Sequence, residues 1–298
     1  MVWGSLIGSS MALLSSRNVE PSIVGLYRHA VKGLSADSLQ QVTLTVGDAF
    51  PDDRRFALLI KPGKVEFSPI EPVWLHKENF LCAFTAPELM ASWEAKYQIK
   101  DDESMTESET KTKRLLTLQH RQSQQIVLDD IDLATNTGKE QLASFFSQLS
   151  NQELVCVAAE SKDHSHQFGN TSSGIKSNGN SRTIHIINSE TVKEISKTFG
   201  CHINPTRFRP NIVMEGLAPW EEFNWVGKKV KCGSTTLEVI KQTVRCKGVS
   251  MDPIDLDNVL DIPGMLSKFY PQYGPYLGVY AQVVESGTIQ IGDLVCEI

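Results

Sequence analysis

Short apolar segments, each closed by Gly, Pro or Asp, recur along most of this chain and limit the folds open to it. Residues 22–27 (SIVGLY), 42–46 (VTLTV) and 55–60 (RFALLI) have the length and residue types of β-strands. VYAQVV (279–284), TIQI and LVCEI follow one another through Gly-containing turns and predict a terminal meander. The pattern predicts a mostly β (α+β) fold, with β-barrel-like parts and a few helices.

Three helices are expected between the strands. The first starts at Pro87, the second at a capping box made by Thr137 and Glu140, and the third at Asn188 or Ser189. Gly200 is expected to end the third helix. The first helix would carry four apolar residues on one face: Leu89, Met90, Trp93 and Tyr97.

Two polar stretches are expected to leave this framework. Residues 101–125 are densely charged, which indicates an exposed excursion between elements. Residues 164–180 are rich in Ser, Gly and Asn and predict a loop. The HSH tripeptide at 164–166 suggests a metal site, but two histidines without a nearby Cys or carboxylate pattern are more often simply solvated.

The overall composition excludes some classes of protein. The formal net charge of -6 argues against a general nucleic-acid binder, which usually has a basic excess. The six cysteines are spread singly, which argues against a disulfide framework and favours a reducing compartment. No stretch predicts a transmembrane helix, so we expect a soluble protein without a membrane span.

With 298 residues, the chain is long enough for two domains. We expect a disordered or weakly targeting segment at 1–20, a small barrel-like domain at 21–130 and a larger domain at 131–298. Residues 1–16 carry no charge, so 1–20 is not a typical signal peptide. The expected compartment is the cytoplasm, or the mitochondrion if 1–20 is a targeting segment.

Four short segments combine positive charge with strand ends or turns: HAVKG (29–33), DDRRF (52–56), TRFRPN (206–211) and VRCK (244–247). Taken singly, each is an ordinary surface element with a solvated cation. Taken together, they predict a pocket for a phosphorylated small molecule, because Arg donors meet phosphate oxygens in pairs. Arg245 and Lys247 flank Cys246 and favour its thiolate, the form that acts as nucleophile or soft-metal ligand; the alternative is an ordinary strand-end cysteine.

Several of these segments also carry a family resemblance. YRHAVKG (27–33), DRRF (53–56, with Asp52 where Gly is usual), RFRPNIV (207–213), PWEE (219–222) with WVG (225–227), Arg245-Cys246 and LGVY (277–280) resemble motifs of the MOSC-domain family and its N-terminal β-barrel domain. The resemblance covers 22–298. The family includes the C-terminal domain of molybdenum cofactor sulfurase and the mitochondrial amidoxime-reducing component.

The resemblance implies a binding site for the molybdenum cofactor, in a cleft between the two domains. Cys246 matches the cysteine that ligates molybdenum and would be the catalytic residue. Lys32, Arg54 and Arg209 match cations that hold the pterin phosphate and dithiolene. Three further residues occupy motif positions expected to bind the cofactor: Arg207, Asn211 and Arg245.

The resemblance also implies an activity. We expect an oxidoreductase that reduces N-hydroxylated or related small molecules with electrons from a partner, either a b-type cytochrome or a flavin or iron–sulfur reductase. The alternatives are a non-enzymatic carrier of the cofactor or of persulfide sulfur on Cys246, and a degenerate member that binds nothing. Residues 67–72 and 252–255 depart from the pattern of the reducing members, and Asn170 or Asn180 stands where an aspartate is expected.

Overall fold

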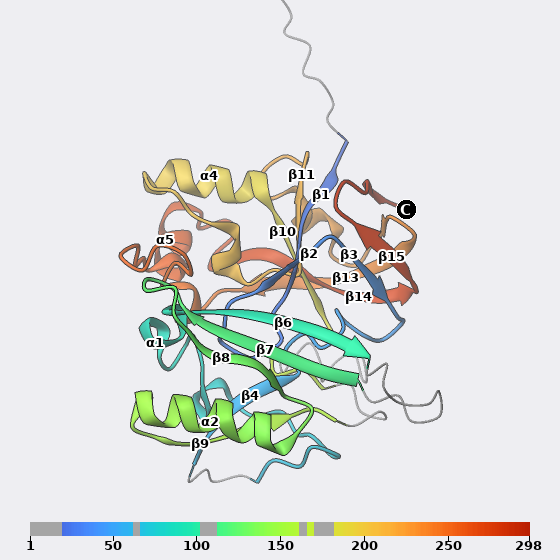
Figure 1. The fold of residues 1–298 in the computed structure, drawn as a ribbon. Helices are drawn as coiled ribbons and strands as arrows, with labels where there is room; N and C mark the ends of the chain where they lie inside the picture. Colours follow the sequence, from blue (N-terminus) through green and yellow to red (C-terminus); the bar gives the residue numbers. More distant parts are fainter. Residues whose placement is uncertain (1–19, 62–65, 102–111, 161–165, 170–181) are drawn as a thin grey trace, which may run out of the picture.

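The structure, a computed structural model, describes residues 20–61, 66–101, 112–160, 166–169 and 182–298 (Figure 1). Some residues interpreted from the sequence lie outside these ranges: 1–19, 102–111, His164, Asn170 and Asn180. The fold is mostly β, with helices at its periphery, as the strand pattern predicted. Within the described ranges, no helix combines the length and apolarity needed to cross a membrane.

The largest unit is a curled sheet of eight strands in the order β16-β12-β13-β14-β10-β11-β1-β2. The strands span Val295–Glu297, Lys229–Cys232, Thr235–Val244, Tyr276–Glu285, Ile184–Asn188, Ile212–Glu215, Ser22–Arg28 and Asp37–Leu39 in that order. All neighbours are antiparallel except β10 and β11. A separate ribbon pairs β15 (Gly287–Gln290) with β3 (Gln41–Leu44). Strands from both ends of the chain therefore enclose one apolar core.

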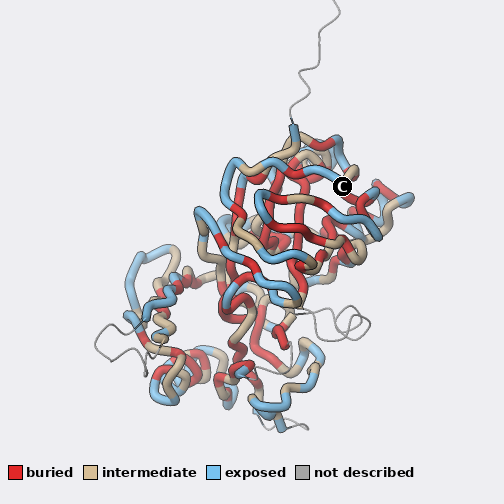
Figure 2. The backbone as a smooth tube through the Cα atoms, turned by 90° about the vertical axis from the view of Figure 1, so that its right-hand side faces the viewer, coloured by how far each residue is buried: buried red, intermediate tan, exposed pale blue. Residues whose placement is uncertain are grey.

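Two three-stranded sheets form the lower part of Figure 1. One has the order β5-β4-β9, with strands Phe80–Leu81, Phe56–Lys61 and Glu153–Ala158. The other has the order β6-β7-β8, with strands Trp93–Asp101, Thr112–His120 and Ile126–Asp132. Helix α2 (Asn136–Ser150) contacts β8 and β9, so it covers both sheets. Buried residues lie along the inner segments of both parts, and most exposed residues lie at the periphery (Figure 2).

The remaining helices are short and lie between strands. The α-helices are α1 (Pro87–Ala91), α4 (Ser189–Phe199) and α5 (Ile262–Phe269). The 3₁₀ turns are η1 (Lys77–Asn79), η2 (Pro205–Phe208), η3 (Glu221–Trp225) and η4 (Lys247–Val249). Asn188 caps α4 by accepting from the Glu190 amide, and Gly200 ends it at φ 70°. Both ends of this helix were predicted from local capping chemistry.

The expected long helix from Pro87 is wrong. Helix α1 ends at Ala91, and Trp93 begins strand β6. Trp93, Ala95 and Tyr97 are buried while Lys96 is exposed, which is the two-residue period of a strand. Apolar residues four apart satisfy both periods, and pairing with β7 selects the strand.

The expected exposed excursion at 101–125 is also wrong for residues 112–120, whereas 121–125 form a turn that is mostly exposed. Residues 112–120 form β7, which pairs with β6 from Trp93↔His120 to Asp101↔Thr112. Leu116 and Leu118 are buried, and polar residues occupy the face turned to solvent. An antiparallel sheet with one solvent-exposed face can carry this many charged residues.

Helix α2 begins earlier than predicted. Its N-cap is Thr135, whose side chain accepts from the Gly138 amide, so the capping box of Thr137 and Glu140 is wrong. A Cβ at Gly138 would lie 2.1 Å from the carbonyl oxygen of Asp132. The close approach of β8 therefore determines where the helix starts.

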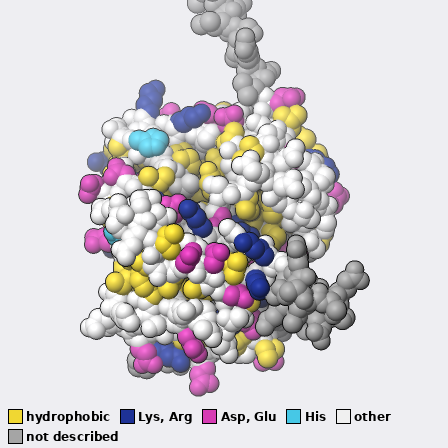
Figure 3. All heavy atoms as spheres, viewed as in Figure 1, with side chains coloured by type: hydrophobic (Ala, Val, Ile, Leu, Met, Phe, Trp, Pro, Cys, Tyr) yellow, Lys and Arg dark blue, Asp and Glu magenta, His cyan; other side chains and the backbone are white. Residues whose placement is uncertain are grey.

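Charged residues tie the upper and lower parts together. Asp52, at φ 60°, accepts from the Tyr97 hydroxyl at 2.8 Å and from Nε of Arg114 at 2.9 Å. Arg28 on β1 pairs with Asp37 at 2.9 Å and donates to the Tyr97 carbonyl. Figure 3 shows charged side chains of both signs at mid-height on this face. Strands β1 and β2, which precede residue 130, thus belong to the main sheet, whereas α2 and β9, which follow it, belong to the lower core. The domain boundary at residue 130 stays a prediction.

Candidate functional site

A cavity of about 1040 Å³, partly open to solvent, lies where the upper and lower parts meet. We call it the main cavity. Five cationic residues line it: Lys32, Arg54, Lys77, Arg209 and Arg245. None of the lining residues that the structure describes is Asp or Glu. The charge of this lining therefore favours an anionic ligand.

The structure brings six of the seven predicted site residues to this cavity: Lys32, Arg54, Arg209, Asn211, Arg245 and Cys246. They come from segments more than 200 residues apart, as expected for a cleft between two parts of the chain. Arg207 does not line the main cavity; it lines a smaller neighbouring one.

Arg209 stands at the centre of the cationic set. It follows η2 in a left-handed conformation, φ 54°. Its Nη1 donates to the carbonyl of Leu34 at 2.7 Å, while its Nη2 is buried without a hydrogen-bond partner among the described residues. Burial, with Arg54 nearby, lowers the pKa of its guanidinium to about 9. A bound anion would satisfy the unpaired donor and stabilise the charge.

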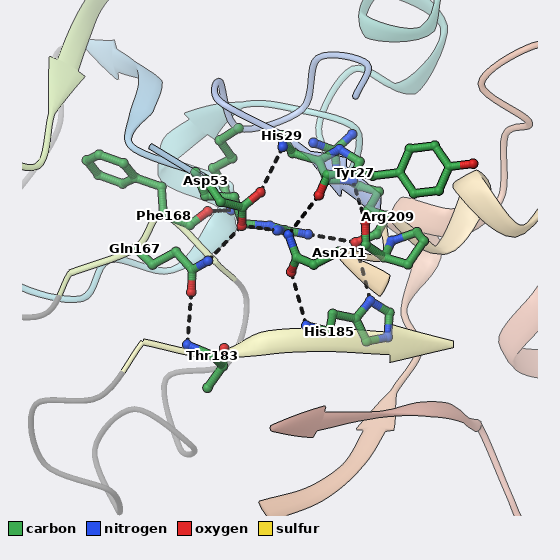
Figure 4. Close-up of polar contacts among 12 residues, drawn as sticks. Tyr27, His29, Asp53, Gln167, Phe168, Thr183, His185, Arg209 and Asn211 are labelled. Atoms are coloured by element: carbon green, nitrogen blue, oxygen red, sulfur yellow. Dashed lines mark hydrogen bonds and ion pairs between the residues drawn. The ribbon is translucent and has the colours of Figure 1, made fainter. Parts of the chain in front are cut away.

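A buried aspartate orients Arg54. Oδ1 of Asp53 accepts from the His29 amide at 2.7 Å, and Oδ2 accepts from Nε2 of Gln167 at 2.7 Å (Figure 4). Arg54 forms an ion pair with the same carboxylate and donates from Nη2 to the Arg209 carbonyl at 2.8 Å. Arg54 and Arg209 are thus held as a unit.

Arg245 is buried and hydrogen-bonded on all sides. Its Nε donates to the Leu277 carbonyl at 2.9 Å, and Nη1 donates to the Phe208 carbonyl at 3.2 Å. Nη2 lies 2.5 Å from Nε2 of His185. The guanidinium therefore has a fixed orientation beside the Cys246 backbone.

Asn211 uses its side chain to join strands. Its Oδ1 accepts from the His185 amide at 3.0 Å, and its Nδ2 donates to the Tyr27 carbonyl at 3.1 Å (Figure 4). It is fully buried. These contacts align β1, β10 and β11 beneath the cavity.

Lys32 is a buried cation that supports the same wall. Its Nζ donates to the Phe168 carbonyl at 3.2 Å. Burial lowers its pKa to about 8, and Cys82 and Cys246 oppose that shift. An added anion would raise this pKa again by favouring the ammonium form.

Two thiols share the main cavity. Cys246 lies between β13 and η4 and is partly exposed, whereas Cys82 follows β5 and is buried. A Cβ at Gly248 would lie 3.6 Å from the Cys246 sulfur and 3.8 Å from the Phe84 Cβ, so the two walls approach closely there. Sequence reasoning missed Cys82 because an apolar segment around a single cysteine gives no functional signal.

Three other lining residues were also missed: Lys77, Gln167 and His185. Lys77 places its Nζ 3.6 Å from the centroid of the Phe84 ring, and Gln167 holds Asp53. None belongs to a motif that the sequence makes visible. His185 lies in β10, where its burial depends on strand pairing.

The donor set fits a cofactor that brings its own metal ligands. Among the described residues, no group of three or more His, Cys, Asp and Glu could hold a metal ion. One accessible thiol beside an unpaired arginine donor and four other cations suits an anionic, metal-carrying group. His166, the described histidine of the HSH tripeptide, packs against Phe67 and Phe168, and burial lowers its pKa to about 4.

Comparison with known proteins finds a match to the family model "MOSC domain" over residues 163–296. No curated protein matches the chain. Among solved structures, YiiM from Geobacillus stearothermophilus is 21% identical with a TM-score of 0.31, and the match covers 39% of this chain and 53% of that one. The YUAD protein from Bacillus subtilis is 11% identical with a TM-score of 0.38, covering 93% and 94%. The chain thus spans about half the length of the YiiM structure.

Proposed function

Residues 163–296 are a MOSC domain, and we propose that the protein binds the molybdenum cofactor in the main cavity with Cys246 as the thiolate ligand of the metal. MOSC domains as a class are associated with molybdenum-cofactor binding. The cofactor is a pterin with a phosphate and a dithiolene, so it carries several negative charges.

One observation carries this proposal: five cations line the main cavity, and none of its described lining residues is acidic. Arg54 has Asp53 as a counter-charge, but Arg209 and Arg245 are buried without a salt bridge among the described residues. Burying such cations is costly, so the set indicates an anionic ligand. Arginine forks match phosphate oxygens in pairs, and thiolate is the protein donor that suits a soft metal centre.

Each residue has a distinct part in the proposed site. Cys246 would supply the sulfur ligand. Lys32, Arg54 and Arg209 would hold the phosphate and dithiolene, with Asp53 keeping Arg54 in place. Arg245 would supply charge beside the ligand cysteine.

The two remaining predicted residues are assigned supporting parts. Asn211 would position the strands, given its contacts to Tyr27 and His185. Arg207 would act in the neighbouring cavity, which it lines.

We propose that the activity is oxidoreduction of small N-hydroxylated or related molecules. The cofactor, when bound, would supply two-electron chemistry at molybdenum. The chain would orient the cofactor, keep Cys246 accessible and hold positive charge around the reacting atoms. Electrons would come from a partner, a b-type cytochrome or a flavin or iron–sulfur reductase. This part of the proposal rests on the family resemblance.

Cys82 favours a second candidate function, a non-enzymatic sulfur carrier. Its thiol lines the same cavity as Cys246. A persulfide on Cys246 could pass its outer sulfur to the Cys82 thiolate, leaving a thiolate on Cys246 and a persulfide on Cys82. No external oxidant is needed for this transfer.

The deciding experiment measures molybdenum and pterin in protein purified from a cofactor-competent host. The variants are Cys246→Ala and, as a matched control, Cys296→Ala, whose thiol is exposed at the C-terminal strand. Near-stoichiometric molybdenum and pterin in wild type and Cys296→Ala, with molybdenum lost or loosened in Cys246→Ala, is the expected result. Absence of both from careful wild-type preparations would overturn the cofactor proposal. Cyanide-releasable sulfur that depends on Cys246 would then favour the carrier.

A further inference from the structure

A smaller cavity adjoins the main cavity, and of its lining residues only Arg207 and Arg209 were predicted to bind the cofactor. We call it the annex; it has about 430 Å³ of space, partly open to solvent. The two cavities share Gly33, Ala83, Arg209 and Gly248 as lining residues. A ligand in the annex would therefore border the space around Cys246.

Besides Arg209, two residues that line the annex carry buried hydrogen-bond donors that have no partner among the described residues. These donors are Nε1 of Trp93 and Nη1 of Arg207; the unpartnered Nη2 of Arg209, on the wall that the two cavities share, is assigned to the cofactor. Trp93 is 7% exposed and Arg207 is 2% exposed, so both are nine-tenths buried or more. Buried donors normally find acceptors, and two on residues that line one cavity indicate an acceptor-bearing ligand.

The surrounding contacts hold Arg207 rigidly while leaving its Nη1 able to donate to a ligand. Its Nη2 donates to Oδ1 of Asn258 at 2.9 Å and also to the Asn258 carbonyl. Its Nε lies 3.7 Å from Oδ2 of Asp252, which is an ion pair beyond hydrogen-bond distance. Nη1 has no such contact. The guanidinium is thus oriented by the chain with one nitrogen left for a ligand.

Charge and surface chemistry narrow the class of ligand. Three arginines line the annex, and none of its described lining residues is Asp or Glu. The third, Arg121, donates from Nε to the Ala91 carbonyl at 3.2 Å and lies 4.0 Å from Glu94. Much of the remaining wall is apolar: Ala83, Pro87, Met90, Ala91, Met251 and Pro253. Cations set in an apolar wall suit a compact apolar body with one anionic end.

We propose that the annex binds a small organic carboxylate, with the carboxylate on Arg207 and Trp93 and the apolar body against Met90 and Met251. The shared Gly248 wall would place this ligand beside Cys246. The inference rests on the proposed function only in making that ligand a substrate of the Cys246 site. The binding itself is independent of the cofactor.

Benzoate is the probe, and benzamide is its neutral counterpart. Binding to the full-length chain is followed by NMR with [¹³C]methyl-methionine labelling. The methyl signals of Met90 and Met251 report on the annex, and Met214, buried in the main core, is the reference. We expect benzoate to shift the Met90 and Met251 signals and to bind about tenfold more tightly than benzamide, since an ionised acceptor strengthens the hydrogen bonds.

Two variants test the donors. Trp93→Phe removes Nε1 and should weaken benzoate by about threefold to tenfold, in line with one lost hydrogen bond. Its matched control is Trp220→Phe, because Trp220 is also buried with an unpartnered Nε1 but stacks on Tyr273 in the main core. Arg207→Lys keeps the positive charge but loses the forked guanidinium, so it should weaken benzoate binding by about tenfold or more.

Equal affinity for benzoate and benzamide would overturn the inference, as would equal effects of Trp93→Phe and Trp220→Phe. Benzoate that binds without shifting Met90 or Met251 would lie elsewhere and would also overturn it. Absence of binding would mean that only water occupies the annex. Molybdenum content of the same preparations is measured separately. Molybdenum in a preparation that does not bind benzoate would reject the annex proposal alone. Benzoate binding to a preparation without molybdenum would reject the cofactor proposal alone.

Discussion

Nε2 of His185 lies 2.5 Å from Nη2 of Arg245, and Nδ1 of the same ring lies 3.3 Å from the carbonyl oxygen of Arg209. An arginine can only donate, so Nε2 accepts and Nδ1–H donates to the carbonyl. Burial, followed by the charge of Arg245, holds the pKa of His185 well below its usual value and keeps the ring neutral. One neutral histidine thus joins the Arg245 guanidinium to the backbone of Arg209.

Replacing His185 should disturb both arginines. We expect His185→Phe to lower the free energy of unfolding by about 1–3 kcal/mol, because a buried donor loses its acceptor. Molybdenum content should fall in the same variant. His202→Phe is the control, since His202 is exposed and should change stability by less than about 0.5 kcal/mol. Unchanged stability and loading in His185→Phe would show that the coupling is unimportant.

The same ring predicts a dependence of stability on pH. Its pKa is lowered by folding, so below about pH 6.5 the unfolded chain binds a proton that the folded chain does not. Stability should therefore fall as pH decreases from 6.5. Urea unfolding at pH 8 and pH 5.5 should show a smaller loss for His185→Gln than for wild type. Identical losses of stability in the two proteins would contradict the assignment of this pH dependence to His185. His29, whose pKa is lowered in the same direction, remains in both proteins.

Glu222 should show the opposite dependence. It is fully buried, it accepts from Asn188 Nδ2 at 3.0 Å and from the Thr191 hydroxyl at 3.0 Å, and burial raises its pKa to about 7. The folded state thus favours the protonated acid, so the carboxyl costs stability as pH rises from 4.5 to 7. Against Glu222→Gln, wild type should lose on the order of 1–3 kcal/mol across this range. Parallel pH profiles of the two proteins would refute this.

Gly33 should be intolerant of a side chain for a reason that goes beyond its backbone angle. Gly33 has φ 96°, and a Cβ there would lie 2.7 Å from the Cα of Cys82. Gly47 has φ 79° with nothing within 4 Å of the same position. Gly47→Ala should cost about 1 kcal/mol of strain alone, whereas Gly33→Ala should cost more.

The measurement for this pair is chemical unfolding together with the rate of Cys82 modification by a thiol reagent. The loop that carries Cys82 should move outward in Gly33→Ala, so Cys82 should react faster there than in Gly47→Ala. Equal unfolding free energies in the two variants would show that the backbone angle is the whole effect.

Local chemistry in the sequence determined much of the framework and marked part of the site. Strand segments were visible from apolar alternation, and both ends of α4 were visible from Asn188 and Gly200. Lys32, Arg54, Arg209, Arg245 and Cys246 stood out as cations and a cysteine near strand ends, and six of the seven predicted residues meet in one cavity. These signals survive because capping and turn chemistry act within a few residues.

Tertiary structure alone decided the rest. Trp93 and Tyr97 satisfy helix and strand periods equally, and pairing with β7 made them a strand. Arg207 and Arg209 are two residues apart, yet the turn at η2 sends Arg207 to the annex alone. Cys82 and His185 joined the site through contacts with residues far along the chain. Long-range packing selects the face that each side chain presents, and a local pattern has no information about that choice.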